Sequence, residues 1–121
     1  MSTAPYFDLF TRGEHHVVTY AAGEPVFHSG EAAECLFVVR RGSMLLHDGD
    51  RELETVTAGG IFGEMALVDG LGRSASATAA TDSELVLLDE RRFQYLLQET
   101  PFFAQAVMRV MAERLRQNKR S

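Results

Sequence analysis

Residues 35–56 read CLFVVRRGSMLLHDGDRELETV, a stretch in which short apolar runs alternate with glycine-containing turns. The first run is continuous and rich in β-branched side chains, which is typical of a fully buried strand. Asp48-Gly49 is a strong hairpin signal, because both residues tolerate a positive φ. Residues 52–56 then alternate charged and apolar side chains, as a half-exposed strand does. The stretch therefore predicts short strands joined by tight turns.

The same pattern continues on both sides of this stretch, since all ten glycines lie between Gly13 and Gly72. It predicts strands at residues 16–20, 26–27, 35–39, 43–47, 52–56, 74–80 and 84–88. After Asp89, a candidate N-cap, the apolar spacing becomes helical, and Thr100-Pro101 is a typical start for a second helix. A short N-terminal helix is indicated at residues 8–10. The expected fold is mainly β with flanking helices: an eight-stranded, jelly-roll-like β-roll followed by two C-terminal helices.

The length and composition of the chain fit one domain. We expect a single unit over residues 1–121, with the roll at about 15–89 and the C-terminal helices at about 90–121. Cys35 is the only cysteine, which excludes a disulfide framework and a thiolate-bound zinc or iron–sulfur cluster. Residues 1–5 do not resemble a signal peptide, and no run approaches the roughly 18 apolar residues of a membrane span. These features predict a cytoplasmic protein without membrane contact.

The charge is distributed unevenly along the chain. Residues 1–89 hold 14 acidic and 5 basic side chains, whereas residues 90–121 hold 3 acidic and 7 basic ones. A protein that grips a nucleic-acid backbone would usually present a broad basic face. We therefore expect no nucleic-acid partner, and an arginine within the acidic part becomes a candidate for a specific role.

Residues 60–77, GIFGEMALVDGLGRSASA, contain the candidate site. Gly63 allows a sharp turn and a close approach to a ligand, and the helical turn after it would present free N–H groups suited to an anion. Arg73 follows a glycine-rich turn, and a guanidinium beside amide groups is suited to a phosphate. Glu64 fits such a site if the ligand also carries a hydroxyl. The alternative is a loop with one surface arginine and one helix-capping glutamate.

This segment resembles the phosphate-binding cassette of cyclic nucleotide-binding domains, the β-roll type of bacterial catabolite activators and protein kinase A regulatory subunits. The family pattern is Phe-Gly-Glu-aliphatic-Ala-Leu, a short loop, and Arg-x-Ala-Ser/Thr. Residues 62–67 match it, as do Arg73, Ala75 and Ser76. The glycine pattern of residues 23–42 also matches that of the family. Gly72 departs from the pattern, because many members have proline there.

The resemblance implies a role for each matching residue. Glu64 would accept a hydrogen bond from the ribose 2′-hydroxyl, and Arg73 would pair with the cyclic phosphate. Backbone amides and the Ser74 hydroxyl would hold the exocyclic oxygens. The ligand-binding residues expected on this basis are Phe62, Gly63, Glu64, Met65, Ala66, Arg73, Ser74 and Ala75. Leu46 and Leu53 would border the base, with Arg114 or Asn118 as a lid. The implied ligand is cAMP, with cGMP as the alternative, and no further cofactor is expected.

Other motifs in the sequence fit known functional patterns less well. Gly70-x-Gly72-x-x-Ala75 superficially fits a dinucleotide fingerprint, but no βαβ unit surrounds it. The four histidines include no His-x-His pair of the kind that metal-binding cupins need, so no metal site is expected. Cys35 lies in an apolar strand and is interpreted as a core residue rather than a nucleophile. No serine-hydrolase, Walker or zinc-protease motif is present, so no enzymatic activity is expected.

The last predicted helix has an apolar stripe with two interpretations: it packs on the roll, or part of it forms a homodimer. The stripe consists of Phe103, Val107, Val110, Met111 and Leu115. The basic residues Arg109, Arg114, Arg116, Lys119 and Arg120 are interpreted as a solvated face. The sequence ends without a helix-turn-helix segment, which favours either a stand-alone sensor or a fragment. We therefore expect a regulatory module that signals to a partner protein through its C-terminal helices. The alternatives are a β-roll scaffold that binds no nucleotide and a truncated transcription factor.

Overall fold

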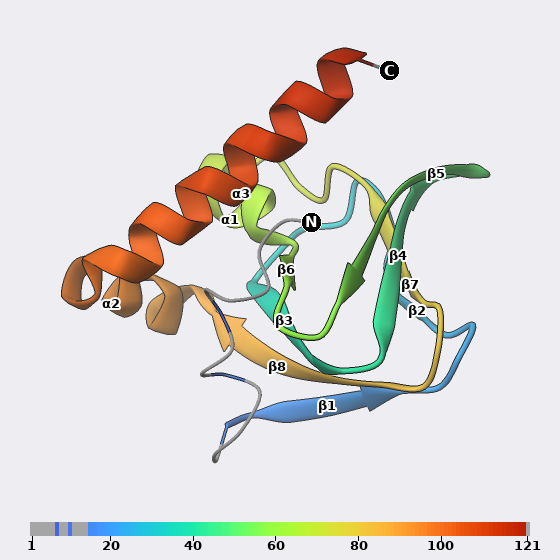
Figure 1. Ribbon diagram of the computed structural model, residues 1–121, viewed down its shortest axis with the longest axis horizontal. Coiled ribbons are helices and arrows are strands. Elements are labelled where there is room, and N and C mark those ends of the chain that lie inside the picture. Colours follow the sequence, from blue (N-terminus) through green and yellow to red (C-terminus); the bar gives the residue numbers. More distant parts are fainter. Residues whose placement is uncertain (1–6, 8–9, 11–14, 121) are drawn as a thin grey trace.

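A computed structural model of the chain describes Phe7, Phe10 and residues 15–120, apart from the side chains of residues 118–120. The described part contains eight strands and three helices, and it confirms the predicted β-roll followed by two C-terminal helices (Figure 1). The elements are β1 (Val17–Tyr20), β2 (Pro25–Phe27), β3 (Cys35–Arg41), β4 (Ser43–Asp48), β5 (Arg51–Thr57), β6 (Ile61–Phe62), α1 (Glu64–Asp69), β7 (Ser76–Ala79), β8 (Ser83–Asp89), α2 (Glu90–Glu99) and α3 (Pro101–Arg120).

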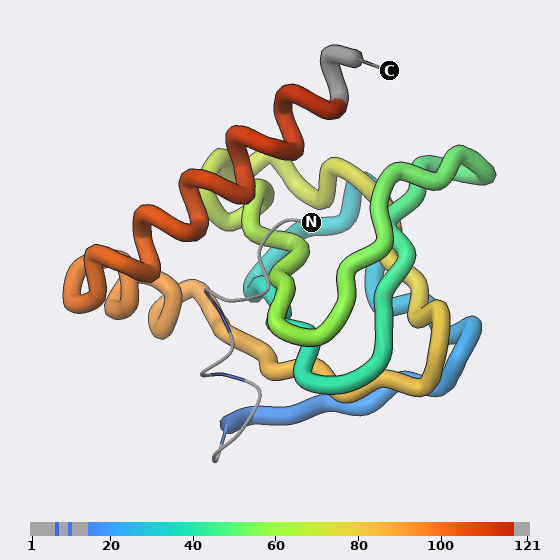
Figure 2. The backbone as a smooth tube through the Cα atoms, viewed as in Figure 1, coloured from blue at the N-terminus to red at the C-terminus, as the bar shows by residue number. Residues whose placement is uncertain are grey.

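The strands form two four-stranded sheets, in the orders β1-β8-β3-β6 and β2-β7-β4-β5. Every pairing is antiparallel, and the β4–β5 hairpin pairs Met44 with Val56. The backbone trace in Figure 2 shows the helices on one side of the roll and the β4–β5 hairpin extending on the other. The short strand β6 leads directly into α1, so this junction lies between the roll and the helices.

Residues 35–39 of β3 form an apolar run, and Leu36 to Val39 within it are buried on both faces of the strand. Leu36 and Val38 pack in a cluster with α2 and α3, whereas Phe37 and Val39 point into the interior of the roll. This is the alternation of a pleated strand, with apolar partners available on either side. Inside the roll, the Phe37 ring stacks on that of Phe62 with 5.1 Å between centroids.

The two C-terminal helices begin as the sequence predicts and cover one sheet. The Asp89 carboxylate accepts a hydrogen bond of 2.8 Å from the Arg92 amide, which confirms the N-cap of α2. The stripe of α3 packs on the roll only in part, since Val107 and Val110 are buried but Leu115 is 51% exposed.

Four details of the predicted element pattern need correction or fall outside the structure. Residues 40–41 were expected in a turn but lie in β3, where Arg41 pairs with Glu84 at 2.7 Å. Strand β6 was not predicted, because two residues are too short for a recognisable periodicity. The helix predicted at residues 8–10 lies largely outside the described residues. Strand β7 begins at Ser76 rather than at residue 74, so residues 74–75 remain in the loop after α1.

Candidate functional site

Gly63 joins β6 to α1 in a conformation that requires glycine. Its φ is 85°, and a Cβ atom at this position would lie 2.6 Å from Nη1 of Arg73. No side chain caps the N-terminus of α1. The first-turn N–H groups of a helix have no partner within the helix itself. The junction therefore combines a close backbone approach with uncapped N–H donors.

The guanidinium of Arg73 is buried without an acidic partner. Its Nη1 donates to the Gly63 carbonyl at 2.9 Å and its Nη2 to the Cys35 carbonyl at 2.8 Å. The group lies 4.1 Å above the centre of the Phe27 ring, a cation–π distance. Arg73 is 6% exposed, and no carboxylate of the described residues lies within 4 Å of it. Its Nε also lacks a hydrogen-bond partner there.

This environment is costly for a cation. Burial lowers the pKa of Arg73 from its ordinary value, although arginine remains protonated in proteins. Buried charges are ordinarily paired with an opposite charge. Glu31 and Glu64 attract this charge, but no carboxylate of the described residues pairs with it within 4 Å, so the position favours an anion.

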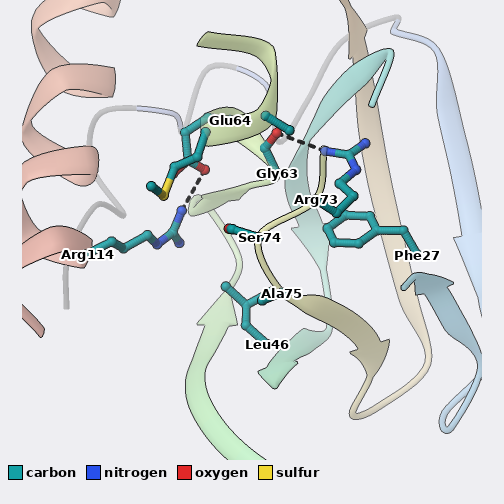
Figure 3. Close-up of a pocket in the computed structure, with 10 residues that line it drawn as sticks. Phe27, Leu46, Gly63, Glu64, Arg73, Ser74, Ala75 and Arg114 are labelled. Carbon is teal, nitrogen blue, oxygen red and sulfur yellow. Dashed lines mark hydrogen bonds and ion pairs between the residues drawn. The ribbon is translucent and has the colours of Figure 1, made fainter. Parts of the chain in front are cut away.

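Glu64, in the first turn of α1, is 1% exposed and does have a charged partner. Its Oε1 accepts a 2.7 Å hydrogen bond from Nη1 of Arg114, which reaches it from α3. In Figure 3, this pair and the pair of Arg73 with Phe27 lie on opposite sides of Gly63. Arg114 also donates to the carboxylate of Glu54 on β5 and to the Ile61 carbonyl. Burial lowers the pKa of Arg114, but the attraction of Glu64 and Glu54 outweighs it, so the pKa of Arg114 is raised.

The charged side chains of the site line two adjoining cavities. A cavity of about 50 Å³ is lined by seven of the eight residues expected to bind the phosphoribose: Gly63, Glu64, Met65, Ala66, Arg73, Ser74 and Ala75. Phe27, Leu46 and Arg114 complete its wall (Figure 3). A second cavity of about 200 Å³ shares Leu46, Ser74 and Arg114 with the first and adds Leu53 and Glu54. The structure thus brings the predicted phosphate residues and three of the four predicted base residues together.

Several expectations need correction. Phe62 does not line either cavity, because its side chain points into the roll and stacks on Phe37. Arg114 does not belong to a solvated face, since its side chain is 12% exposed and paired with two carboxylates. The side chain of Asn118 lies outside the described part of the structure. Cys35 is half-buried against the interior of the roll, in agreement with its interpretation as a core residue.

The sequence did not indicate two of the residues at this site, Phe27 and Glu54. Phe27 is 46 residues from Arg73, and Glu54 is 60 residues from Arg114. No local motif links such distant positions. The opposite charges of Glu54 and Arg114 are the only feature of the sequence that could suggest their contact, and many other acidic and basic residues of the chain could be paired on the same ground.

The described residues include no group of three or more His, Cys, Asp or Glu side chains placed to hold a metal ion. Among the helices that the structure describes, none is both long and apolar enough to cross a membrane.

Fold and site together define a β-roll with a small cavity that is lined by the buried Arg73 and bordered by Arg114 of the C-terminal helix. The chain belongs to the cyclic nucleotide-binding domain family, whose profile matches residues 17–100.

Individual relatives support this assignment. The chain is 36% identical to the cyclic AMP receptor protein of Thermus thermophilus over 103 residues, which cover 81% of this chain and 48% of the relative. The crystal structure of the Thermus thermophilus catabolite activator protein superposes with a TM-score of 0.79 at 30% identity, covering 96% of this chain and 57% of the other. A structure described under a cyclic-GMP-dependent signalling pathway of bacterial phytopathogenesis gives a TM-score of 0.76 at 30% identity, covering 92% and 89%. The chain spans half or less of the length of the curated relatives it matches.

Proposed function

We propose that this chain binds a cyclic nucleotide, with cAMP as the first candidate, and acts as a regulatory rather than a catalytic domain. The observation that carries the proposal is the buried guanidinium of Arg73, which has no carboxylate within 4 Å among the described residues. A cyclic phosphate bears a single negative charge and would compensate this cation. Charge-assisted hydrogen bonds of this kind contribute about 1.5–3 kcal/mol each.

The surroundings of Arg73 fit a phosphate better than a carboxylate ligand. The Met65 and Ala66 amides lie in the uncapped first turn of α1, and Ser74 and Ala75 precede β7, outside the sheet ladder. All four residues line the smaller cavity with Arg73. The exocyclic oxygens of a phosphate would therefore meet several N–H donors and the Ser74 hydroxyl in addition to the guanidinium.

Glu64 supplies the second half of the recognition. An anion alone would be repelled by a buried carboxylate, whereas a ribose 2′-hydroxyl next to the phosphate can donate to it. Arg114 engages only Oε1 of Glu64, which leaves Oε2 out of the ion pair. The purine would occupy the larger cavity, against Leu46 and Leu53.

The choice of cAMP over cGMP rests on the ligands for which relatives of this chain are named. The 36% identical receptor protein is named for cyclic AMP, and a structural neighbour of similar size is described in a cyclic-GMP pathway. The Ser74 side chain is compatible with either base. Both nucleotides therefore belong in the first binding experiment.

Isothermal titration calorimetry with cAMP and cGMP tests the proposal. Wild-type protein is expected to bind at least one of them below about 100 μM, and Arg73→Ala to weaken that binding roughly a hundredfold. Arg91→Ala, which removes an exposed arginine of α2, is the matched control and is expected to bind like wild type. If wild type binds neither nucleotide, the chain is better described as a β-roll scaffold.

We further propose that α3 transmits occupancy, because Arg114 connects it to Glu64 in the cavity wall. Such a signal would need a different ligand affinity in two arrangements of the helices. The receiver would be a partner protein or a second copy of the chain.

Two exposed apolar side chains of α3 favour the second copy. Met108 is 62% and Leu115 51% exposed, and they are seven residues apart, the spacing of a helix-pairing seam. Sedimentation velocity is expected to show a dimer that Leu115→Glu converts to a monomer. A wild-type monomer at high micromolar concentration would contradict this.

A further inference from the structure

Glu54 has a place in the site that the family pattern does not assign. Its side chain projects from β5 and is 20% exposed. Its two oxygens accept hydrogen bonds from the same guanidinium, at 2.9 Å from Nε and 3.1 Å from Nη2 of Arg114. This two-point pairing uses one whole edge of the planar group and fixes its orientation.

The orientation of Arg114 determines how it meets Glu64. With the Nε–Nη2 edge occupied by Glu54, and Nη2 also donating to the Ile61 carbonyl at 2.6 Å, the nitrogen directed at Glu64 is Nη1. Nη1 makes a bond of 2.7 Å to a single oxygen, Oε1. Glu64 is therefore held by one contact from Arg114 rather than by a two-point pair.

The net charge of the three side chains also leaves Glu64 available to a hydrogen-bond donor. One guanidinium lies between two carboxylates, so the group of Glu54, Glu64 and Arg114 carries a formal charge of about −1. Glu64 thus keeps negative character toward the cavity that it lines. Without Glu54, Arg114 and Glu64 would form an isolated neutral pair, and the freed edge of the guanidinium would be available to both oxygens of Glu64.

We propose that Glu54 is a positioning residue for ribose recognition: by holding one edge of Arg114, it keeps one oxygen of Glu64 free to accept the 2′-hydroxyl of the ligand. The inference rests on the proposed function. It assigns to a β5 side chain, which need not touch the phosphate or the ribose, control over the selection for a ribose hydroxyl.

The test compares cAMP with 2′-deoxy-cAMP by calorimetry in wild type and in Glu54→Gln. Loss of one hydrogen bond to a charged acceptor predicts that wild type prefers cAMP by roughly tenfold to a hundredfold. In Glu54→Gln the preference is expected to fall to about threefold or less, because cAMP binding weakens while 2′-deoxy-cAMP binding changes little. Glu99→Gln, an exposed charge change at the end of α2, serves as the control and is expected to keep the wild-type preference.

This ratio separates positioning from general destabilisation, since a loosened fold would weaken both ligands equally. Circular dichroism and thermal unfolding verify that the variants are folded. If Glu54→Gln does not fold, Glu54→Asp replaces it, because the shorter side chain cannot reach both nitrogens and the preference is again expected to fall. An unchanged preference in the folded variant overturns the inference and leaves cyclic-nucleotide binding intact. Absence of binding to wild type would overturn both proposals together.

Discussion

Gly63 offers the sharpest test of how the backbone builds the site, because the chain contains a matched control. Gly63 and Gly23 have nearly the same positive φ, 85° and 87°. A Cβ atom on Gly23 would have no atom within 4 Å, whereas on Gly63 it would lie 2.6 Å from Nη1 of Arg73. Gly23→Ala therefore introduces backbone strain alone, and Gly63→Ala introduces the same strain and displaces the guanidinium.

Backbone strain is measured as a loss of stability, whereas displacement of the guanidinium is measured as a loss of nucleotide affinity. A left-handed backbone costs an alanine about 1–2 kcal/mol, so Gly23→Ala is expected to lose about this free energy of unfolding in urea and Gly63→Ala at least as much. In Gly63→Ala, Arg73 must also move away from the Gly63 carbonyl, to which it donates at 2.9 Å. A misplaced charge-assisted contact of about 1.5–3 kcal/mol corresponds to roughly tenfold to a hundredfold weaker nucleotide binding. Equal affinity of the two variants for cAMP would refute this account of the glycine.

Three further predictions concern the surroundings of the site. Phe27→Leu removes the aromatic ring that lies against the Arg73 guanidinium. A cation–π contact contributes about 0.5–2 kcal/mol, the larger values being found at buried sites, so the variant is expected to bind the nucleotide roughly threefold to tenfold more weakly in calorimetry. Asp89→Ala removes the N-cap of α2 and is expected to lower the free energy of unfolding by about 1 kcal/mol in urea, whereas Asp89→Ser retains most of it. Burial raises the pKa of the Cys35 thiol above its ordinary value of 9.0, so iodoacetamide is expected to alkylate the folded protein slowly at pH 7.5 and faster above pH 9. Since the folded state then holds this proton to a higher pH than the unfolded chain, the thiol's contribution to stability is present below pH 9 and declines above it. Equal labelling rates for folded and urea-unfolded protein at pH 7.5 would contradict this.

The part of the site that lies within one contiguous segment was predictable from the sequence. Gly63 and Arg73 are only ten residues apart, and Gly70 and Gly72 between them indicate the turn that brings them together. The strands were predictable for a similar reason, because the two-sided burial of β3 appears in the sequence as the uninterrupted apolar run of residues 35–39. In both cases the physical cause acts over a few neighbouring residues.

The remainder depends on how distant elements pack. Arg114 lies among basic residues typical of a solvated helix end, and its side chain becomes only 12% exposed because α3 crosses the roll where β5 presents Glu54. Phe62 belongs to the sequence pattern of the site, yet its side chain serves the core, since the pleat of β6 directs it inward. A motif thus identifies positions that a site needs, but not whether each one contacts the ligand or supports the backbone beside it.

The two arginines of the site have opposite electrostatic situations, and this difference bears on the proposed transmission of binding through α3. Arg73 is a buried cation without an acidic partner within 4 Å in the described structure, so its charge favours ligand entry. Arg114 already has two carboxylates, so its charge favours the contact of α3 with the roll before any ligand is present. A ligand that bonds to Glu64 draws on the same carboxylate that holds α3. Because a ligand shifts a conformational equilibrium only through a difference in affinity between states, the shared carboxylate is the physical point at which occupancy and helix position can affect each other.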